Sequence, residues 1–266
     1  MPPSMSDSAG KSDIPTHRAG GGIFIVKNSS LRVSDLSISI GPDGAMASNL
    51  TVSLAMNVFP YWLEIAQEQM TAVESASAAV KEAWYGTDDR ALVDAMEREC
   101  RASMQTIVAS AIAMDAFYAF LRRHVPLPEE MSLAWRTNRT ARHKQISEIL
   151  RRGIRLGPES AMRIRNVLRE LFRYRDMAVH PKAVFTSPAW YPELNFSTEW
   201  RFVAFRRHNA HALCGTTLSI IAQCVARPKA EVPELVEFCK PLPSELSSLV
   251  DAWEDRYGSL YTRDSE

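Results

Sequence analysis

The sequence predicts a mainly α-helical protein, a helical bundle preceded by a small β-hairpin or meander. Two patterns favour this fold class. From residue 59 onward, apolar residues recur every three or four positions, which is the spacing of amphipathic helices. Over residues 37–54, polar and apolar residues alternate, which is typical of half-buried strands. With 266 residues, 46% of them hydrophobic, the chain is long enough for one large domain or two small ones with a real core.

The N-terminal part is predicted to contain a tail and then strands. Residues 1–22 are rich in Ser, Gly and Pro and lack an apolar core, so we expect a disordered tail and not a secretory signal. Residues 23–58 are predicted to form the β extension, because two alternating segments flank a Gly-Pro-Asp-Gly turn at residues 41–44. A β-prone run at residues 23–26 would make it a three-stranded meander. A lone hairpin is marginal in water, so its apolar face must pack on something.

Residues 59–230 are predicted to form the helical bundle. The long second helix begins with Thr87 as its N-cap and ends before Pro126, which cannot continue a helix. Between the motif helix and the next one we expect a proline-rich loop, with a strand near residues 200–205. Residues 231–266 are predicted to be an acidic C-terminal extension with two short helices. The predicted helices cover about residues 60–84, 87–124, 138–152, 158–180, 207–225, 232–240 and 243–257.

Composition favours a cytoplasmic protein without a membrane segment. No apolar run approaches the roughly 20 residues that a membrane span needs. The four cysteines, Cys100, Cys214, Cys224 and Cys239, are far apart and form no CxxC pair, so we expect reduced thiols in the core and no zinc module.

Charge is distributed unevenly along a chain whose formal net charge is zero. Residues 136–182 contain 13 Lys and Arg against 4 Asp and Glu, whereas residues 231–266 contain 9 acidic residues against 3 basic ones. Such asymmetry suggests a basic surface that could meet phosphate. The simpler interpretation is that these charges only solvate helix faces, or that the two segments lie against each other.

The most informative stretch is residues 168–181, at the end of the fourth predicted helix. Leu168 and Leu171 belong to an apolar stripe, and Arg175 lies on the same stripe. A guanidinium is expensive to bury without a partner. We therefore expect Asp115, which lies among apolar positions of the long helix, to pair with Arg175 across the bundle.

Asp176 and His180 are four residues apart, so their side chains can form a hydrogen bond on one helix face. Arg175 and His180 are five apart, and on a regular helix they point about 140° away from each other. A cleft shared by two protomers would bring such residues together, and so would a loosened last turn before Pro181.

These residues resemble the signature of the HEPN superfamily. The family's pattern is an arginine and a histidine separated by four to six residues, with Asn, Asp or His favoured after the arginine, at the end of the third core helix. Here Asp-Met-Ala-Val separates Arg175 from His180. The resemblance covers about residues 90–226 and implies a HEPN-like bundle of four core helices plus extra helices. Lys182 stands where some toxins of the family have a tyrosine.

The resemblance implies a metal-independent endoribonuclease without a cofactor, active as a homodimer through the motif helix. RNA would supply its own nucleophile, the 2′-hydroxyl. We expect His180 to transfer protons, Arg175 to hold the phosphate and Asp176 to orient the site. The residues expected to contact flanking phosphates are Arg169, Arg173 and Lys182. Such a protein would be a toxin or a defence or stress effector, with RNA and an antitoxin or regulatory protein as partners.

Other interpretations stay open. The chain could be a catalytically inactive HEPN module, acting as a dimerisation or RNA- or nucleotide-binding scaffold, or a helical protein whose basic face binds another protein. His180 could be only a cationic helix cap, which stabilises by roughly 0.3–1 kcal/mol. His208 and His211 are three apart and could bind a metal, but we expect this pair to face solvent.

Overall fold

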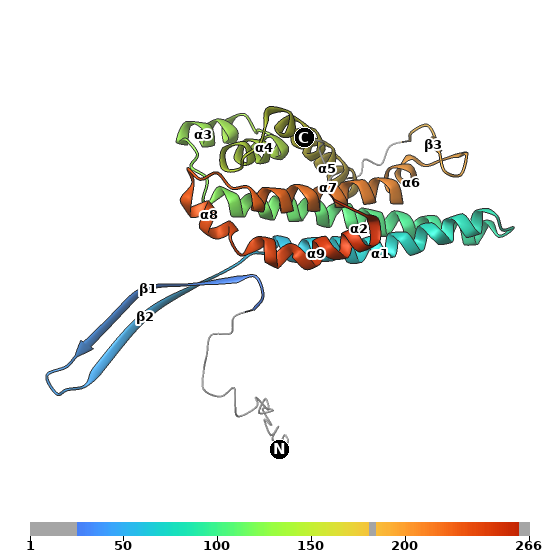
Figure 1. Ribbon diagram of the computed structural model, residues 1–266. Helices are drawn as coiled ribbons and strands as arrows, with labels where there is room; N and C mark the ends of the chain where they lie inside the picture. The colour runs from blue at the N-terminus through green and yellow to red at the C-terminus, as the bar shows by residue number, and fades with distance from the viewer. Residues whose placement is uncertain (1–25, 181–184, 261–266) are drawn as a thin grey trace, which may run out of the picture. The chain divides into compact units, whose positions relative to one another are not determined.

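The computed structural model describes residues 26–180 and 185–260, and only the backbone of Ser30. The chain divides into two compact units, Met1–Met56 and Asn57–Glu266. The first contains a two-stranded antiparallel hairpin and the second is mainly helical, which confirms a mainly α-helical protein with a small N-terminal hairpin (Figure 1). The predicted tail at residues 1–22 and the β-prone residues 23–25 lie outside the described residues.

The hairpin consists of β1 (Ser29–Ile40) and β2 (Met46–Met56). Its turn is the predicted one: the N–H of Gly44 donates to the carbonyl of Gly41 at 2.9 Å, and Gly44 has a φ of +78°, a conformation that favours glycine. Both strands are longer than the alternating segments that predicted them, residues 37–40 and 50–54. From residue 26 onward, the described part of this unit contains these two strands and no third one.

The second unit contains all nine helices of the described chain and a small second hairpin. The elements are α1 (Phe59–Trp84), α2 (Asp89–Arg122), α3 (Glu129–Thr137), α4 (Arg142–Gly153), α5 (Pro158–Val179), β3 (Ala189–Tyr191), β4 (Phe196–Thr198), α6 (Trp200–Ala204), α7 (Arg207–Ala226), α8 (Pro233–Cys239) and α9 (Leu242–Tyr257).

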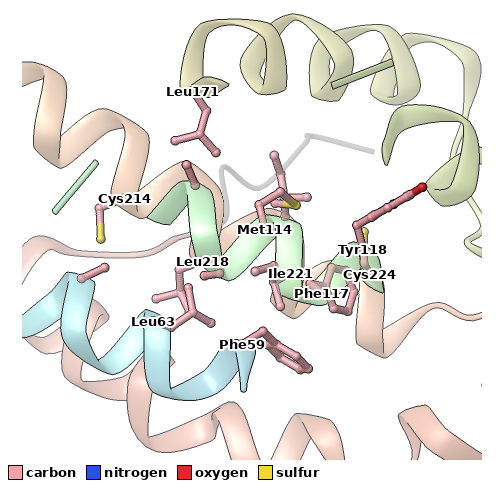
Figure 2. Close-up of a cluster of buried hydrophobic side chains, with 14 of the residues drawn as sticks. Phe59, Leu63, Met114, Phe117, Tyr118, Leu171, Cys214, Leu218, Ile221 and Cys224 are labelled. Carbon is pink, nitrogen blue, oxygen red and sulfur yellow. The ribbon is translucent and has the colours of Figure 1, made fainter. Parts of the chain in front are cut away.

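The helices pack in layers around α2 and α7. Helices α4 and α5 lie on one side of this pair, and α1 and α9 lie on the other (Figure 1). Figure 2 shows the core where four helices meet: Phe59 of α1 packs edge-on against Phe117 of α2, with ring centroids 5.2 Å apart, while Leu171 of α5 and Leu218 of α7 approach from the other helices. Because the side chains of these four residues are almost fully buried, apolar packing fixes where α5 lies.

One helix, α2, is long and apolar enough by composition to cross a membrane, but most of its apolar segment is buried inside the bundle. A helix that is apolar on most sides and lies in the core of a bundle passes the same test. Its N-cap is Asp88, one residue later than the predicted Thr87, because the Asp88 carboxylate accepts hydrogen bonds from the N–H groups of Arg90 and Ala91.

Two segments differ from the sequence prediction. Helix α3 follows Pro128 with Glu129 and Glu130 in its first turn; it was not predicted, and none of its residues is buried. The prediction of a strand near residues 200–205 is wrong. That segment is the short helix α6, started by Glu199, whose carboxylate accepts from the N–H of Arg201 at 2.7 Å, while the strands β3 and β4 lie just before it.

Candidate functional site

Most of the predicted site residues line one cavity beside the second half of α5. The cavity has a volume of about 900 Å³, in the range of small-molecule sites. Side chains from α4, α5, α6 and the connection after α5 surround it. The lining residues are Ala141, His143, Arg169, Phe172, Arg173, Asp176, Met177, His180, Thr186 and Trp200. The structure therefore brings together Arg169, Arg173, Asp176 and His180 on a surface that also has apolar walls.

Helix α5 presents these residues because of how it begins and ends. Pro158 occupies its first turn, where the missing N–H costs nothing. Leu168 and Leu171 are fully buried, so the remaining faces are left for charged residues. The helix ends at Val179, and His180 follows with a φ of −123° and a ψ of 58°, while its N–H still donates to the Asp176 carbonyl at 2.8 Å. The side chain of His180 thus leaves the regular helical direction.

Arg175 does not pair with Asp115, so that prediction is wrong. Its Nε lies 2.9 Å from Oδ1 of the neighbouring Asp176, and its guanidinium lies over the Phe172 ring, 5.2 Å from the centroid. Asp115 instead lies 2.9 Å from Nε of Arg142. The apolar stripe correctly placed Arg175 on a partly buried face, but a stripe does not reveal which charge from another helix comes nearest.

The ion pairs Arg175–Asp176 and Arg142–Asp115 are close in distance but do not have hydrogen-bond geometry. Nε of Arg175 and Oδ1 of Asp115 are both buried and have no hydrogen-bond partner. Arg175 is also absent from the described lining of the cavity, although Asp176 and His180 on either side of it belong to that lining. Within one chain, Arg175 therefore does not line the cavity but contacts Asp176, which does.

Two arginines give the cavity its positive charge. Arg173 is bound to Glu170, with its Nε 2.8 Å from Oε2, and Arg169 lies 3.7 Å from the other oxygen of the same carboxylate. Their side chains are 54% and 61% exposed, so neither guanidinium is held by burial. An exposed ion pair of this kind contributes little to stability. Both arginines are consequently available to an anion that enters the cavity.

His143 of α4 is a cavity residue that the sequence did not reveal. Partial burial, followed by the positive charges of Lys144, Arg165 and Arg169, lowers the pKa of its imidazole below the usual 6.5. The cavity thus holds two histidines, His143 on α4 and His180 directly after the end of α5, which packs against α4. No spacing pattern links residues 143 and 180, because only the packing of α4 against α5 brings them to one place. The basic residues around His143 were visible in the sequence, but they do not single it out.

Aromatic side chains form another wall. Trp200, at the start of α6, and Phe172 of α5 both line the cavity. One face of the Trp200 indole is covered by the guanidinium of Arg201, 4.8 Å from the ring centroid. Flat apolar surfaces beside cations are suited to a nucleobase next to a phosphate.

The connection that carries Trp200 is tied to the bundle by a buried carboxylate. Glu99 of α2 is only 2% exposed, and its two oxygens accept hydrogen bonds from the Tyr191 hydroxyl and from the N–H of Arg207, both at 2.9 Å. Burial, and then the negative charge of Glu99, raise the pKa of the Tyr191 hydroxyl well above its usual range. This contact fixes both ends of the segment between β3 and α7.

Among the described residues, no group of three or more His, Cys, Asp or Glu side chains could hold a metal ion. His211 packs against Trp253 and Tyr257 of α9, with ring centroids 5.1 and 4.8 Å away, so it is a packing residue and not the solvent-facing one expected. His208 is exposed, as expected. Lys182, the remaining predicted phosphate contact, lies outside the described residues.

Comparison with known proteins gives no independent guide, because no family model, no curated protein and no solved structure matches this chain.

Proposed function

We propose that the chain is a metal-independent endoribonuclease of HEPN type whose active site is the cavity between α4 and α5. The observation that carries the proposal is that two histidines, His143 and His180, and two exposed arginines, Arg169 and Arg173, line a single cavity. Proton transfer and charge stabilisation are the two tasks that cleavage of RNA by its own 2′-hydroxyl requires.

We assign the two histidines opposite roles in proton transfer. A lowered pKa keeps His143 neutral near pH 7, as a general base must be, so we assign it to taking the proton of the 2′-hydroxyl. As the 2′-oxygen bonds to phosphorus, the bond to the 5′-oxygen breaks, and His180 protonates that leaving oxygen. The products are a 2′,3′-cyclic phosphate and a free 5′-hydroxyl.

The arginines and aromatics would bind the substrate. Arg169 and Arg173 exchange their exposed contacts with Glu170 for the phosphate oxygens, which adds charge-assisted hydrogen bonds as negative charge builds up. The open part of the Trp200 indole stacks on a base.

Asp176 and Arg175 would organise the end of α5. The carbonyl of Asp176 receives the His180 N–H, and its carboxylate lies against Arg175. The proposal includes the homodimer through the motif helix that the HEPN resemblance implies. There, the side chain of Arg175, which is 34% exposed, meets the phosphate from across the interface. The biological role that fits such an enzyme is a toxin or defence effector controlled by a partner protein.

The test is cleavage of a pool of RNAs by the purified chain in EDTA. We expect products ending in 2′,3′-cyclic phosphate, a loss of about 10²–10⁴-fold in rate for His180→Ala and for His143→Ala, and no cleavage of the matching DNA. His208→Ala is the matched control, because this histidine is exposed and lies outside the cavity lining. Arg175→Ala tests the dimer cleft.

Cleavage that survives His180→Ala unchanged would overturn the site. Binding of RNA without cleavage by the wild type would instead identify the chain as the RNA-binding scaffold of the alternative interpretation. Thermal unfolding of each variant shows whether lost activity reflects lost chemistry or lost folding.

A further inference from the structure

The N-terminal hairpin has one face that is almost entirely apolar. Residues paired across an antiparallel ladder lie on the same face of the sheet, and every second residue of a strand returns to that face. Five alternate pairs along the hairpin are apolar at nine of their ten positions, and Ser48 is the exception. The pairs are Leu31–Leu54, Val33–Val52, Leu36–Leu50, Ile38–Ser48 and Ile40–Met46.

A bulge keeps this face continuous. In β1, Val33 and Leu36 are three residues apart, so in a regular strand they would point to opposite faces. The register shifts between Val33 and Asp35, which leaves Ser34 as the extra residue, and its hydroxyl lies 3.4 Å from the Thr51 carbonyl. The bulge therefore turns Leu36 back to the face of Val33. The one extra residue in β1 thus keeps the apolar face continuous along the whole hairpin.

This face is open in the hairpin. Nine large apolar side chains of the two strands are between 42% and 71% exposed: Leu31, Val33, Leu36, Ile38, Ile40, Met46, Leu50, Leu54 and Met56. At roughly 100 Å² each, they make about 900 Å² of contiguous apolar surface, more than the roughly 300–600 Å² of the largest patch on a typical monomer. It also matches the roughly 800 Å² that each partner contributes to a stable interface.

Charge and shape indicate what covers the face. The two charged residues of the strands, Arg32 and Asp35, pair with Ser53 and Thr51 on the opposite face, so the apolar face offers nothing to a charged partner. The helical unit offers no matching stretch among its described residues, since its large exposed apolar side chains are divided among α1, α2, α3, α5, β3 and the connecting loops. The surface that matches this face in length and polarity is the same face of another copy.

We propose that two copies of this chain associate through their hairpins, apolar face to apolar face. Two such ribbons, each about 37 Å long, would pack as a small four-stranded sandwich with the layers about 10 Å apart. The polar faces would remain in water, and the buried area would reach the roughly 1,600 Å² of a standard interface. This interface is separate from the motif helix and does not depend on the proposed enzyme activity.

The test places the same charge pair on either face of the full-length chain. Leu36→Lys with Leu50→Glu puts a cross-strand Lys–Glu pair on the apolar face, whereas Ser37→Lys with Asn49→Glu puts it on the polar face. Both double variants keep the net charge at zero and the strand pairing intact. Mass is measured by sedimentation equilibrium at micromolar concentrations. Fluorescence confirms that the helical unit is folded, because all six tryptophans follow residue 57.

We expect the wild type and the polar-face variant to have the same mass, at least twice the 29.8 kDa of one chain, and the apolar-face variant to have half of that mass: one chain if the motif helix does not associate, and two chains if it does. A monomeric wild type would overturn the proposal, because the face would then be covered within the chain or by another protein. An apolar-face variant with the same mass as the wild type would overturn it too, as would an equal loss of mass in both variants, since the effect would not belong to the apolar face.

Discussion

The buried hydrogen bond between Tyr191 and Glu99 can be tested by a substitution that removes one hydroxyl group. Tyr191→Phe removes a hydroxyl that donates to Oε2 of Glu99 and leaves the ring, which stacks on Phe196 with centroids 5.8 Å apart, in place. Tyr191 is 3% exposed and Glu99 is 2% exposed, so water does not readily replace the lost donor. A hydrogen bond to a charged group contributes about 1.5–3 kcal/mol.

The expected loss in the free energy of unfolding is therefore about 1.5–3 kcal/mol, which changes the folding equilibrium by about one to two powers of ten. At about 2–4 °C per kcal/mol for a unit of this size, Tm should fall by about 3–12 °C. The matched control is Tyr85→Phe, because Tyr85 is 86% exposed, and this change should alter stability by less than about 0.5 kcal/mol.

Urea unfolding followed by both fluorescence and circular dichroism measures these differences. A double-mutant cycle with Glu99→Gln should give a coupling energy of about 0.5–3 kcal/mol, since the two side chains are in contact. If Tyr191→Phe were as stable as Tyr85→Phe, the Glu99 carboxylate would not hold the segment between β3 and α7, and the reasoning would fail.

Three further predictions follow from packing and burial. Gly215→Ala should destabilise the chain by about 1–3 kcal/mol, because the new methyl group would lie 2.5 Å from Cζ2 of Trp253. The control is Gly157→Ser, whose side chain enters open space at the N-cap of α5, so this change should be neutral or stabilising. Burial raises the thiol pKa values to about 11 or 12, so none of the four cysteines should react with a thiol reagent at pH 8 before unfolding, and rapid modification of the native chain would contradict this. An NMR titration of His143 should give a pKa below 6.5, and a value at or above 6.5 would remove its suitability as the base.

The sequence predicted what depends on local pattern. The helix starting at Pro158 and ending before Pro181, and the turn at residues 41–44, follow from residue types whose backbone preferences act within a few positions. The first strand was predicted to begin at residue 37 but begins at Ser29, because the bulge after Val33 interrupts the alternation by which a strand is recognised. The bulge arises from the pairing of β1 with β2, and an alternating pattern within one strand carries no information about that pairing.

The candidate site was predicted in part for the same reason. The motif placed Asp176 and His180 at one helix end, and both line the cavity. The partner of Arg175 was predicted wrongly, and His143 was missed, since both depend on how separate helices pack. Arg142 pairs with Asp115 because the start of α4 reaches the C-terminal part of α2, a contact between residues 27 positions apart in sequence that no helical repeat encodes.

The cavity and the hairpin should respond oppositely to salt, which separates the two proposals in one set of measurements. Binding of single-stranded RNA through Arg169 and Arg173 displaces about two counterions, so the logarithm of the binding constant should fall with the logarithm of salt concentration with a slope of about −1.4 or steeper. The His180→Ala variant allows this to be measured without cleavage, and replacing both arginines with glutamine should reduce the slope by about 1.4.

Association through the apolar hairpin face involves no charged residue of the strands, so the dimer should persist as salt rises and should strengthen in sulfate, which favours burial of apolar surface. An RNA affinity that does not change with salt would contradict phosphate binding in the cavity. A dimer that dissociates as salt rises would show that charges, and not the apolar face, hold the two copies together.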